Sequence, residues 1–269
     1  MINRENIRDM GRVVKGVPEA RKIVSAHQPD VVLSTGGYVS VPVGLAARTT
    51  KSPLVVHEQT VRVGLANRAL ARFADAIAVS SESILPLLKD GKAKAIVTGN
   101  PVRPAVFTGQ ADMAVAALAL PGYAASLESS LQHADTLPPA LRSRYWLSDF
   151  VGPELPDVLA LADVVVSRSG AGTIAELTAL SKPSVLIQLA SLAGNEQEYN
   201  ALHLQQAGAA IALVNGRAYA DELQRALEPI LTSQDRRQEM ARNAAALGLP
   251  DAAARLVDVL LKVGLRDAL

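Results

Sequence analysis

The stretch Asp163-Val164-Val165-Val166-Ser167-Arg168-Ser169-Gly170-Ala171-Gly172-Thr173-Ile174-Ala175-Glu176 decides the fold. Its opening run of valines predicts a buried strand over 163–166. The residues after the two glycines predict a helix over 171–180. Gly170 and Gly172 lie where the strand gives way to the helix, and they let the backbone approach a ligand closely. A strand that enters a helix through such a turn is typical of a parallel α/β sheet that binds a phosphate-bearing ligand.

The same alternation of strands and helices extends in both directions from this stretch. Strands are predicted over 30–34, 53–56, 76–79, 95–98, 163–166, 184–187 and 210–214, and helices over 3–27, 41–48, 65–73, 171–180, 196–207, 219–231, 234–246 and 251–263. Pro18 is expected to kink or split the first helix. Alternation of this kind forms parallel β-α-β units, so two runs of it predict two Rossmann-like domains with a boundary between 104 and 150.

The segment from Thr108 to Phe150 breaks the alternation. Its only β-branched residues are Thr108, Val115 and Thr136, and no strand is predicted in it. Weak helices are predicted over 112–120 and 124–133. We therefore expect that the second domain lacks part of a regular α/β unit.

Composition excludes several classes of function. The 269 residues carry 27 basic and 26 acidic side chains, so no overall field attracts nucleic acid. There is no cysteine, and the four histidines lack metal-ligand spacing, so disulfides, thiol catalysis and a metal site are not expected. No apolar run reaches the roughly 18 residues of a membrane span, and residues 1–6 show no signal-peptide core. We expect a cytoplasmic protein, for which attachment to a membrane surface remains open.

Five loops follow predicted strands or open predicted helices, where ligands bind in open parallel sheets. In the loop that contains Gly170 and Gly172, the helix N-terminus and the Thr173 hydroxyl suit phosphate, and the Glu176 carboxylate suits paired sugar hydroxyls. The alternative is an ordinary strand-to-helix turn with a first-turn glutamate. Gly36-Gly37-Tyr38-Val39-Ser40 is either a second ligand loop or a simple turn.

The remaining three loops are polar. His57-Glu58-Gln59 directly follows an apolar strand and forms either an acid/base pair or, as we favour, a scaffold that orders loops. In Gly99-Asn100-Pro101-Val102-Arg103, the arginine either reaches a carbonyl or phosphate or is solvated. Gln197 and Asn200 share a helix face and either bracket sugar hydroxyls or belong to a plain polar surface.

In their order and spacing, these five loops resemble the MurG family, the bacterial peptidoglycan N-acetylglucosaminyltransferases with a two-domain GT-B fold. The resemblance covers roughly 20–107 and 141–263. It implies transfer of N-acetylglucosamine from UDP-GlcNAc to lipid I with inversion, giving lipid II, without a cofactor or tightly held metal. It also implies a peripheral protein on the cytoplasmic face of the plasma membrane, which serves cell shape and division and meets other cell-wall synthesis proteins.

The resemblance also assigns residues. Glu176 would hold the ribose, Gly172 and Thr173 would face the phosphates, and Gln197 with Asn200 would face the sugar. The full donor site would comprise Thr60, Arg103, Val151 through its backbone at the uracil, Arg168, Ser169, Gly170, Ala171, Gly172, Thr173, Ile174, Ala175, Glu176, Gln197 and Asn200. The acceptor side would comprise Gly36, Gly37 and Tyr38. The catalytic base stays unknown, with His57 and Glu58 as possible support.

The sequence departs from the family pattern in three places. No Gly-Gly-Thr-Gly-Gly-His-type segment precedes residue 1, the stretch 108–140 lacks the family's strand and Gly-Gly-Ser-Gln-Gly loop, and Thr60 stands where the family has asparagine. We therefore expect both domains to be incomplete, with exposed strand edges. The predicted partition is a partial acceptor-side domain over 1–107, an irregular connection over 108–140, a partial UDP-sugar-binding domain over 141–249 and a C-terminal helix over 250–269.

Three functions follow from these patterns. The first is a transferase of the MurG type, which the five loops favour. The second is a catalytically impaired UDP-sugar-binding paralogue, or a subunit that needs a partner chain, which the missing loops favour. The third, a UDP-sugar epimerase, is opposed by Tyr38 and by His57-Glu58-Gln59. By family we choose the first, although we expect no turnover by this chain alone, because losing a single oxyanion donor commonly costs about a hundredfold in rate.

Overall fold

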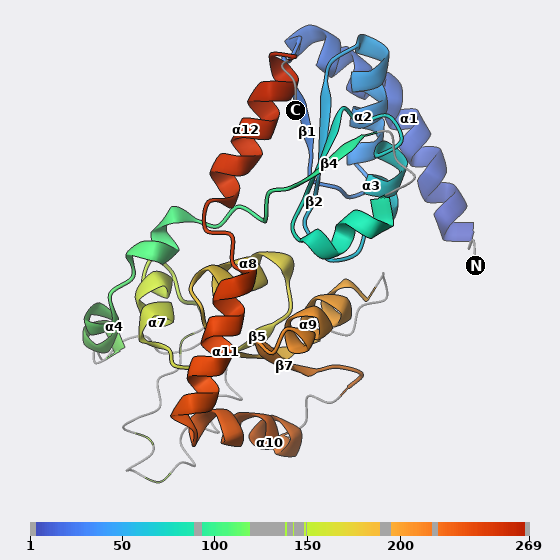
Figure 1. Cartoon of the computed structure of the whole chain (residues 1–269). Coiled ribbons are helices and arrows are strands. Elements are labelled where there is room, and N and C mark those ends of the chain that lie inside the picture. The colour runs from blue at the N-terminus through green and yellow to red at the C-terminus, as the bar shows by residue number, and fades with distance from the viewer. Residues whose placement is uncertain are drawn as a thin grey trace. The chain divides into compact units, whose positions relative to one another are not determined.

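The computed structural model describes residues 4–88, 93–118, 138, 142, 148, 150–188, 195–216 and 220–266 (Figure 1). The chain divides into two compact units. The first comprises Met1–Val102 with Val166–Leu269, and the second comprises Arg103–Val165. Both sheets belong to the first unit, apart from one strand residue, Val165. Alternating strands and helices with two separate parallel sheets confirm the predicted α/β fold class.

The first sheet has four parallel strands in the order β1-β2-β3-β4. They are β1 (Val32–Ser34), β2 (Leu54–Glu58), β3 (Ala76–Val79) and β4 (Lys94–Val97). Every residue of β2 and β3 is buried, as expected for central strands rich in valine, isoleucine and alanine. The carboxyl ends of these two strands therefore hold the loops that follow them on a rigid base.

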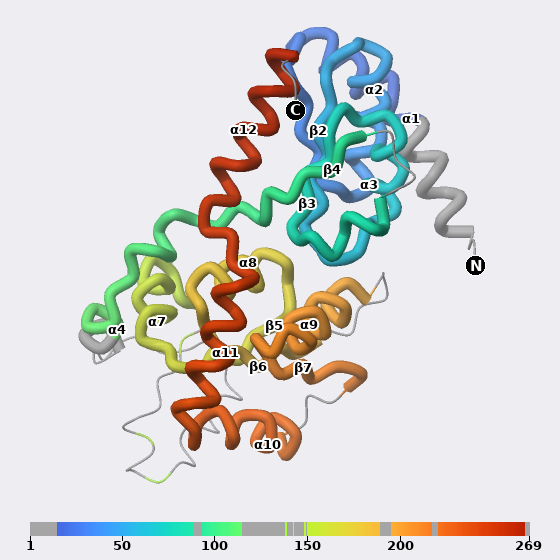
Figure 2. Tube along the Cα trace, in the orientation of Figure 1, coloured from blue at the N-terminus to red at the C-terminus, as the bar shows by residue number. Residues whose placement is uncertain are grey.

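Helices cover both faces of this sheet. They are α1 (Arg4–His27), α2 (Ser40–Thr50), α3 (Leu65–Leu70) and, from the other end of the chain, α12 (Ala252–Gly264), with the 3-10 helix η1 (Glu82–Leu88) after β3. Alternate residues of β2 serve the two faces, as the period of a strand requires. Leu54 and Val56 pack with Leu70. Val55 lies on the opposite face and packs with Val259 of α12, which Figure 2 shows in red beside the strands.

The second sheet has the order β5-β6-β7. Its strands are β5 (Val165–Arg168), β6 (Ser184–Ile187) and β7 (Ala210–Leu213), and its helices are α8 (Ala171–Ala179), α9 (Glu196–Gln206), α10 (Ala220–Leu231) and α11 (Gln234–Leu247). The central strand β6 is parallel to β7, and Val185 and Leu186 in it are fully buried. The glycine-rich loop predicted from the sequence joins β5 to α8.

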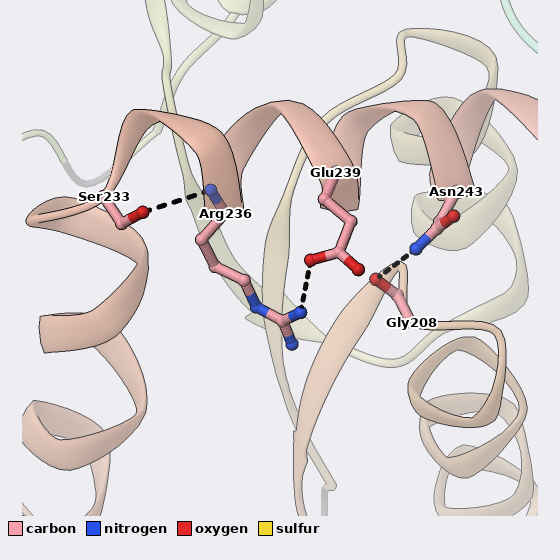
Figure 3. Close-up of polar contacts among 5 residues, drawn as sticks. All are labelled: Gly208, Ser233, Arg236, Glu239 and Asn243. Atoms are coloured by element: carbon pink, nitrogen blue, oxygen red, sulfur yellow. Dashed lines mark hydrogen bonds and ion pairs between the residues drawn. The ribbon is translucent and has the colours of Figure 1, made fainter.

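Helix α11 is fixed by polar contacts at both ends (Figure 3). The Ser233 hydroxyl accepts a hydrogen bond from the Arg236 amide at 3.2 Å and so caps the first turn. An exposed ion pair joins Arg236 and Glu239 at 2.7 Å. Further along, the Asn243 amide donates to the Gly208 carbonyl oxygen at 3.2 Å. The helix is thereby attached to the turn that leads into β7.

The second unit contains the 3-10 helix η2 (Pro104–Thr108) and the helices α4 (Ala111–Leu118) and α7 (Leu155–Leu161). The Asp157 carboxylate accepts a hydrogen bond from the Gln110 amide at 2.7 Å and joins the starts of α4 and α7. Among the described residues of this unit, Val165 is the first that belongs to a strand. Helix α4 confirms most of the helix predicted over 112–120, whereas the one predicted over 124–133 lies outside the described residues.

Several sequence predictions need correction. Pro18 lies inside α1 without splitting it. Strand β5 begins at Val165, two residues later than predicted, and α3 ends at Leu70, three residues early. His57 and Glu58 do not follow β2 but are its last two residues, because they pair with β3. A strand is predicted from a run of apolar residues. Such a run cannot reveal polar residues that belong to the strand because their side chains are hydrogen-bonded inside the sheet.

The strands β1 and β5 lie at sheet edges and keep apolar side chains partly in solvent. Leu33 is 40% exposed and Val166 is 41% exposed. In the described part of the chain, no helix is long and apolar enough to cross a membrane.

Candidate functional site

The loop after β5 leads into the N-terminus of α8. Gly170 occupies the cap position with extended backbone, and no side chain caps the helix there. The first internal bond runs from the Ile174 amide to the Gly170 carbonyl oxygen at 3.0 Å. The preceding amides and the positive end of the helix dipole therefore suit a phosphate or another anion.

Gly172 is not required by packing. A Cβ atom built on it meets nothing within 4 Å, and its backbone is helical. The space beside the first turn of α8 is thus not filled by protein. Thr173 and Glu176 lie in the same helix and are half-buried.

Ser169 connects this loop to α9. Its hydroxyl donates to the Gln197 carbonyl oxygen at 2.7 Å, and its own carbonyl oxygen accepts from the Asn200 amide at 3.1 Å. Ser169 and Asn200 are buried, whereas Gln197 is half-buried. Two residues predicted to face the sugar therefore lie on a helix turn that the glycine-rich loop holds in place.

Two asparagine amides bridge this loop to the segment after β2. Asn200 accepts a hydrogen bond through Oδ1 from the Val61 amide at 3.3 Å. The Asn100 amide donates to the carbonyl oxygens of Gln59 at 2.8 Å and Ala171 at 3.4 Å. The segments after β2 and β5 are therefore joined by hydrogen bonds at two points.

Glu58 organises the segment after β2. One oxygen of its buried carboxylate accepts from the Thr60 amide at 3.1 Å and the Thr60 hydroxyl at 3.0 Å. The other oxygen accepts from the Gly64 amide and the Asn67 side chain, each at 2.9 Å. Four hydrogen bonds satisfy the carboxylate, and this is the geometry of a scaffold that orders the loop.

His57 is equally enclosed. It is 1% exposed, and its Nε2 atom donates to the Gly99 carbonyl oxygen at 3.0 Å. Burial lowers the pKa of His57, against the opposing effects of the Gly99 hydrogen bond and the nearby Glu58 charge. A neutral imidazole within a sheet ties β2 to the end of β4 and has no open path to a substrate.

A cavity of about 450 Å³ lies at the carboxyl ends of β3 and β4. Its polar lining includes Gln59, Ser81, Asn100, Asn200 and His203, and its apolar lining includes Ala171, Ile174, Ala175 and Leu204. The Ser81 hydroxyl and His203 Nε2 lie 3.5 Å apart, and burial lowers the pKa of His203. The Asn100 Oδ1 atom is buried and without a partner among the described residues. The cavity adjoins the predicted donor loop through Ala171 and Asn200.

The loop after β1 also forms as a glycine turn. Gly36 and Gly37 have φ of +94° and +83°, which favours glycine at both positions. A Cβ on Gly36 would lie 3.2 Å from the Asn67 side chain, whereas Gly37 faces open space. Tyr38 is 70% exposed, and the Ser40 hydroxyl donates to the Gly37 carbonyl oxygen at 2.7 Å.

Arg103 and Val151, the remaining predicted donor residues, belong to the second compact unit. Arg103 stands at the N-cap of η2 with extended backbone. Sequence reasoning missed Asn67, Arg62, Tyr199, Ser81 and His203. Each is a single polar or aromatic residue within a longer motif or helix, and no pattern of spacing marks it. The described residues contain no group of acidic or histidine side chains that could hold a metal ion.

Two parallel sheets, with a glycine-rich strand-to-helix loop at the edge of one, define a protein of the GT-B class. Family models agree. The chain matches the glycosyltransferase family 28 N-terminal domain over residues 1–79 and the C-terminal domain of the same family over residues 145–256. It is 32% identical to "UDP-N-acetylglucosamine--N-acetylmuramyl-(pentapeptide) pyrophosphoryl-undecaprenol N-acetylglucosamine transferase 1" of Bacillus cereus. That match covers 97% of this chain and 81% of the relative. The chain therefore belongs to glycosyltransferase family 28, among the MurG-type transferases.

Solved structures agree on the fold. MurG of Acinetobacter baumannii matches with a TM-score of 0.71 and 23% identity, over 93% of this chain and 80% of that protein. A putative UDP-N-acetylglucosamine 2-epimerase of Listeria monocytogenes matches with a TM-score of 0.62 and 14% identity, over 95% and 80%. At these identities the matches establish the GT-B fold alone.

The match to the Bacillus cereus relative also shows a difference in length inside the matched region. It runs over 299 aligned positions, more than the 269 residues of this chain. The relative therefore carries residues inside the matched region that this chain lacks.

Proposed function

We propose that this chain binds UDP-GlcNAc at the loop between β5 and α8 and is a transferase of the MurG type. In this reaction N-acetylglucosamine moves from UDP-GlcNAc to lipid I and forms lipid II. The observation that carries the proposal is the α8 N-terminus without a side-chain cap, whose loop is fixed to α9 by Ser169. The name of a relative that is 32% identical over 97% of the chain supports the choice of substrates.

The site residues take the following roles in this proposal. The α8 N-terminus, with Gly172 and Thr173, binds the diphosphate, and the Glu176 carboxylate accepts hydrogen bonds from the ribose hydroxyls. Gln197 reaches the sugar. Asn200 supports the helix turn that carries Gln197, because both the oxygen and the nitrogen of its side-chain amide are already hydrogen-bonded to backbone groups. For Arg103 and the Val151 backbone, the resemblance alone suggests contacts with the uridine. Gly36, Gly37 and Tyr38 serve the acceptor.

The chemistry is an inverting displacement. A hydroxyl of the acceptor sugar attacks the anomeric carbon, its proton passes to a base, and UDP leaves from the opposite face. Amides and the helix dipole at α8 stabilise the charge that develops on the leaving diphosphate. His57 is buried with Nε2 bonded to Gly99, and both oxygens of the buried Glu58 carboxylate accept hydrogen bonds, so we assign both residues to support of the loop and not to proton transfer.

The proposal extends to location and partners. A lipid-linked acceptor requires the protein to work at a membrane surface, and we place it peripherally on the cytoplasmic face, where UDP-GlcNAc is available. Its partners are then UDP-GlcNAc, lipid I and other cell-wall synthesis proteins, and its cellular role is peptidoglycan synthesis in support of cell shape and division.

A second candidate function is a UDP-sugar-binding protein without turnover, or a subunit that needs a partner chain. The internal gap against the relative favours it, because the relative carries residues inside the matched region that this chain lacks. The donor loop after β5 is intact in both candidates, so only the transfer step separates them.

Calorimetry with UDP and UDP-GlcNAc tests the site, and synthesis of lipid II from lipid I tests the reaction. We expect binding that Glu176→Ala abolishes and that Glu239→Ala, on the surface of α11, leaves intact. Equal binding by Glu176→Ala would remove the site assignment. Turnover by the purified chain would establish the first candidate, whereas binding without turnover would establish the second. Absence of binding by the unaltered chain would contradict both.

A further inference from the structure

The first turn of α9 carries residues that the proposed function needs, and it is held from outside the helix. Asn195 stands at its N-cap in the left-handed conformation, with φ of +50°, and makes no side-chain bond to the helix backbone. The Asn195 side-chain amide donates instead to the Glu198 carboxylate at 3.0 Å, so the backbone amides of the first turn have no side-chain cap. Contacts with other segments therefore contribute to the orientation of this turn.

Three anchors supply those contacts. Ser169 holds the Gln197 carbonyl oxygen at 2.7 Å. Asn200 is bonded to the Ser169 carbonyl oxygen and the Val61 amide. Between them on the helix, the Tyr199 ring lies under the Arg62 guanidinium, with 4.4 Å from the guanidinium carbon to the ring centroid.

Arg62 is itself well placed to act as an anchor. The single proton of the Thr60 hydroxyl is shared between the Arg62 carbonyl oxygen, at 2.6 Å, and the Glu58 carboxylate, which also accepts from the Thr60 and Gly64 amides. The backbone on either side of Arg62 is thus attached to a buried carboxylate at the end of β2. Tyr199 is 41% exposed, so the contact lies at the surface beside Gln197.

We propose that Arg62 and Tyr199 form a strap that positions Gln197 for the sugar of a nucleotide-sugar donor. The strap joins the segment after β2 to the first turn of α9, and both residues are positioning residues that need not touch the substrate. This inference rests on the proposed function, because it takes UDP-GlcNAc as the ligand. It adds that the strap contributes to binding of the sugar and not of the nucleotide.

Comparison of UDP with UDP-GlcNAc separates these contributions. The ratio of the Kd for UDP to the Kd for UDP-GlcNAc reports the sugar alone, whereas general damage to the site would weaken both ligands together. Cation–π contacts at exposed sites contribute enough to change a Kd by about two- to fivefold. We therefore expect Tyr199→Leu and Arg62→Ala each to lower this ratio about two- to fivefold, with the Kd for UDP unchanged.

Conservative variants and a double variant complete the test by calorimetry on the full chain. Tyr199→Phe keeps the ring and should keep the ratio. The double variant of Arg62→Ala with Tyr199→Leu should behave like either single variant, because the two residues act through one contact. Arg68→Ala, an exposed arginine on α3, is the matched control and should leave both Kd values unchanged.

The outcomes are distinct. An unchanged ratio in Tyr199→Leu, or an equal loss of UDP and UDP-GlcNAc binding, would overturn the strap while leaving the proposed function in place. The same holds if the unaltered chain binds UDP and UDP-GlcNAc equally well. If the unaltered chain binds neither ligand, the proposed function fails, and the strap fails with it.

Discussion

The side-chain amide of Asn200 donates a hydrogen bond to the backbone carbonyl oxygen of Ser169 at 3.1 Å, and both residues are buried. Because the same amide accepts from Val61, one side chain connects α9, the loop after β5 and the segment after β2. A residue expected to contact the sugar is therefore first of all a structural link between three segments.

Replacing Asn200 by alanine should lower the free energy of unfolding by about 1–3 kcal/mol, because it removes the partners of the buried Ser169 carbonyl oxygen and of the half-buried Val61 amide. Chemical denaturation monitored by circular dichroism measures this change. Gln206→Ala is the control, since Gln206 is exposed near the end of the same helix. A loss of less than about 0.5 kcal/mol in Asn200→Ala would show that the link is dispensable.

Replacing Glu58 by glutamine should destabilise the fold by at least about 1.5–3 kcal/mol, the usual contribution of one hydrogen bond to a charged group. The amide cannot accept all four of the hydrogen bonds that the carboxylate accepts. Glu239→Gln removes an exposed carboxylate paired with Arg236 and should cost less than about 1 kcal/mol. Equal unfolding midpoints for the two variants would argue against the scaffold role of Glu58.

Stability should fall as the solution is acidified below about pH 6.5, the ordinary pKa of histidine. Burial lowers the pKa of His57 and of His203 in the folded protein, so the unfolded chain binds more protons in this range. The two neutral imidazole rings contribute their full stabilisation above that pH. This stabilisation is lost as the pH falls towards the lowered pKa values of the two histidines in the folded protein. His57→Gln keeps a donor for the Gly99 carbonyl oxygen and should flatten the slope of unfolding free energy against pH. An unaltered slope in both His57→Gln and His203→Gln would contradict this assignment.

Two helical glycines should respond oppositely to alanine. Gly172→Ala should raise stability by about 0.4–1 kcal/mol, because the new methyl group meets open space and the unfolded chain loses freedom. Gly44→Ala should lower it by about 1–3 kcal/mol, because the methyl group would overlap the side chain of Leu70 in α2's contact with α3. Thermal unfolding of both variants and of the unaltered chain measures the two changes in stability. A destabilised Gly172→Ala would mean that the loop needs glycine for its own conformation.

Much of the fold is visible in the sequence because buried parallel strands are nearly continuous apolar runs. Ala76–Val79 and Ser184–Ile187 were predictable for this reason. The end of β2 was not, because His57 and Glu58 are polar and only their partners, Gly99 and Asn67, show that they belong inside the sheet. The extent of α1 was predicted to within one residue, but the split expected at Pro18 does not occur, because packing of α1 on α2 overrides a local breaker.

In the candidate site, too, some residues were predictable from the sequence and others were not. The glycine-rich loop and Glu176 were predictable, since a strand, two glycines and a helix form one local unit. The strap between Arg62 and Tyr199 was not, because its two residues are far apart in the chain and neither belongs to a motif. The assignments of donor and acceptor residues remain predictions for the binding experiments to test.

The position of α12 also has a consequence for synthesis on the ribosome. Leu256, Val259 and Val263 complete the core on one face of the first sheet, against Val55, Ala76 and Ala78. At ordinary rates of translation, β3 emerges roughly 10–30 s before this helix is made. During that interval the face of the nascent sheet stays open to water and to other chains. Early folding of this protein therefore depends on whatever shields that apolar face, such as a chaperone at the tunnel exit, until the last helix arrives.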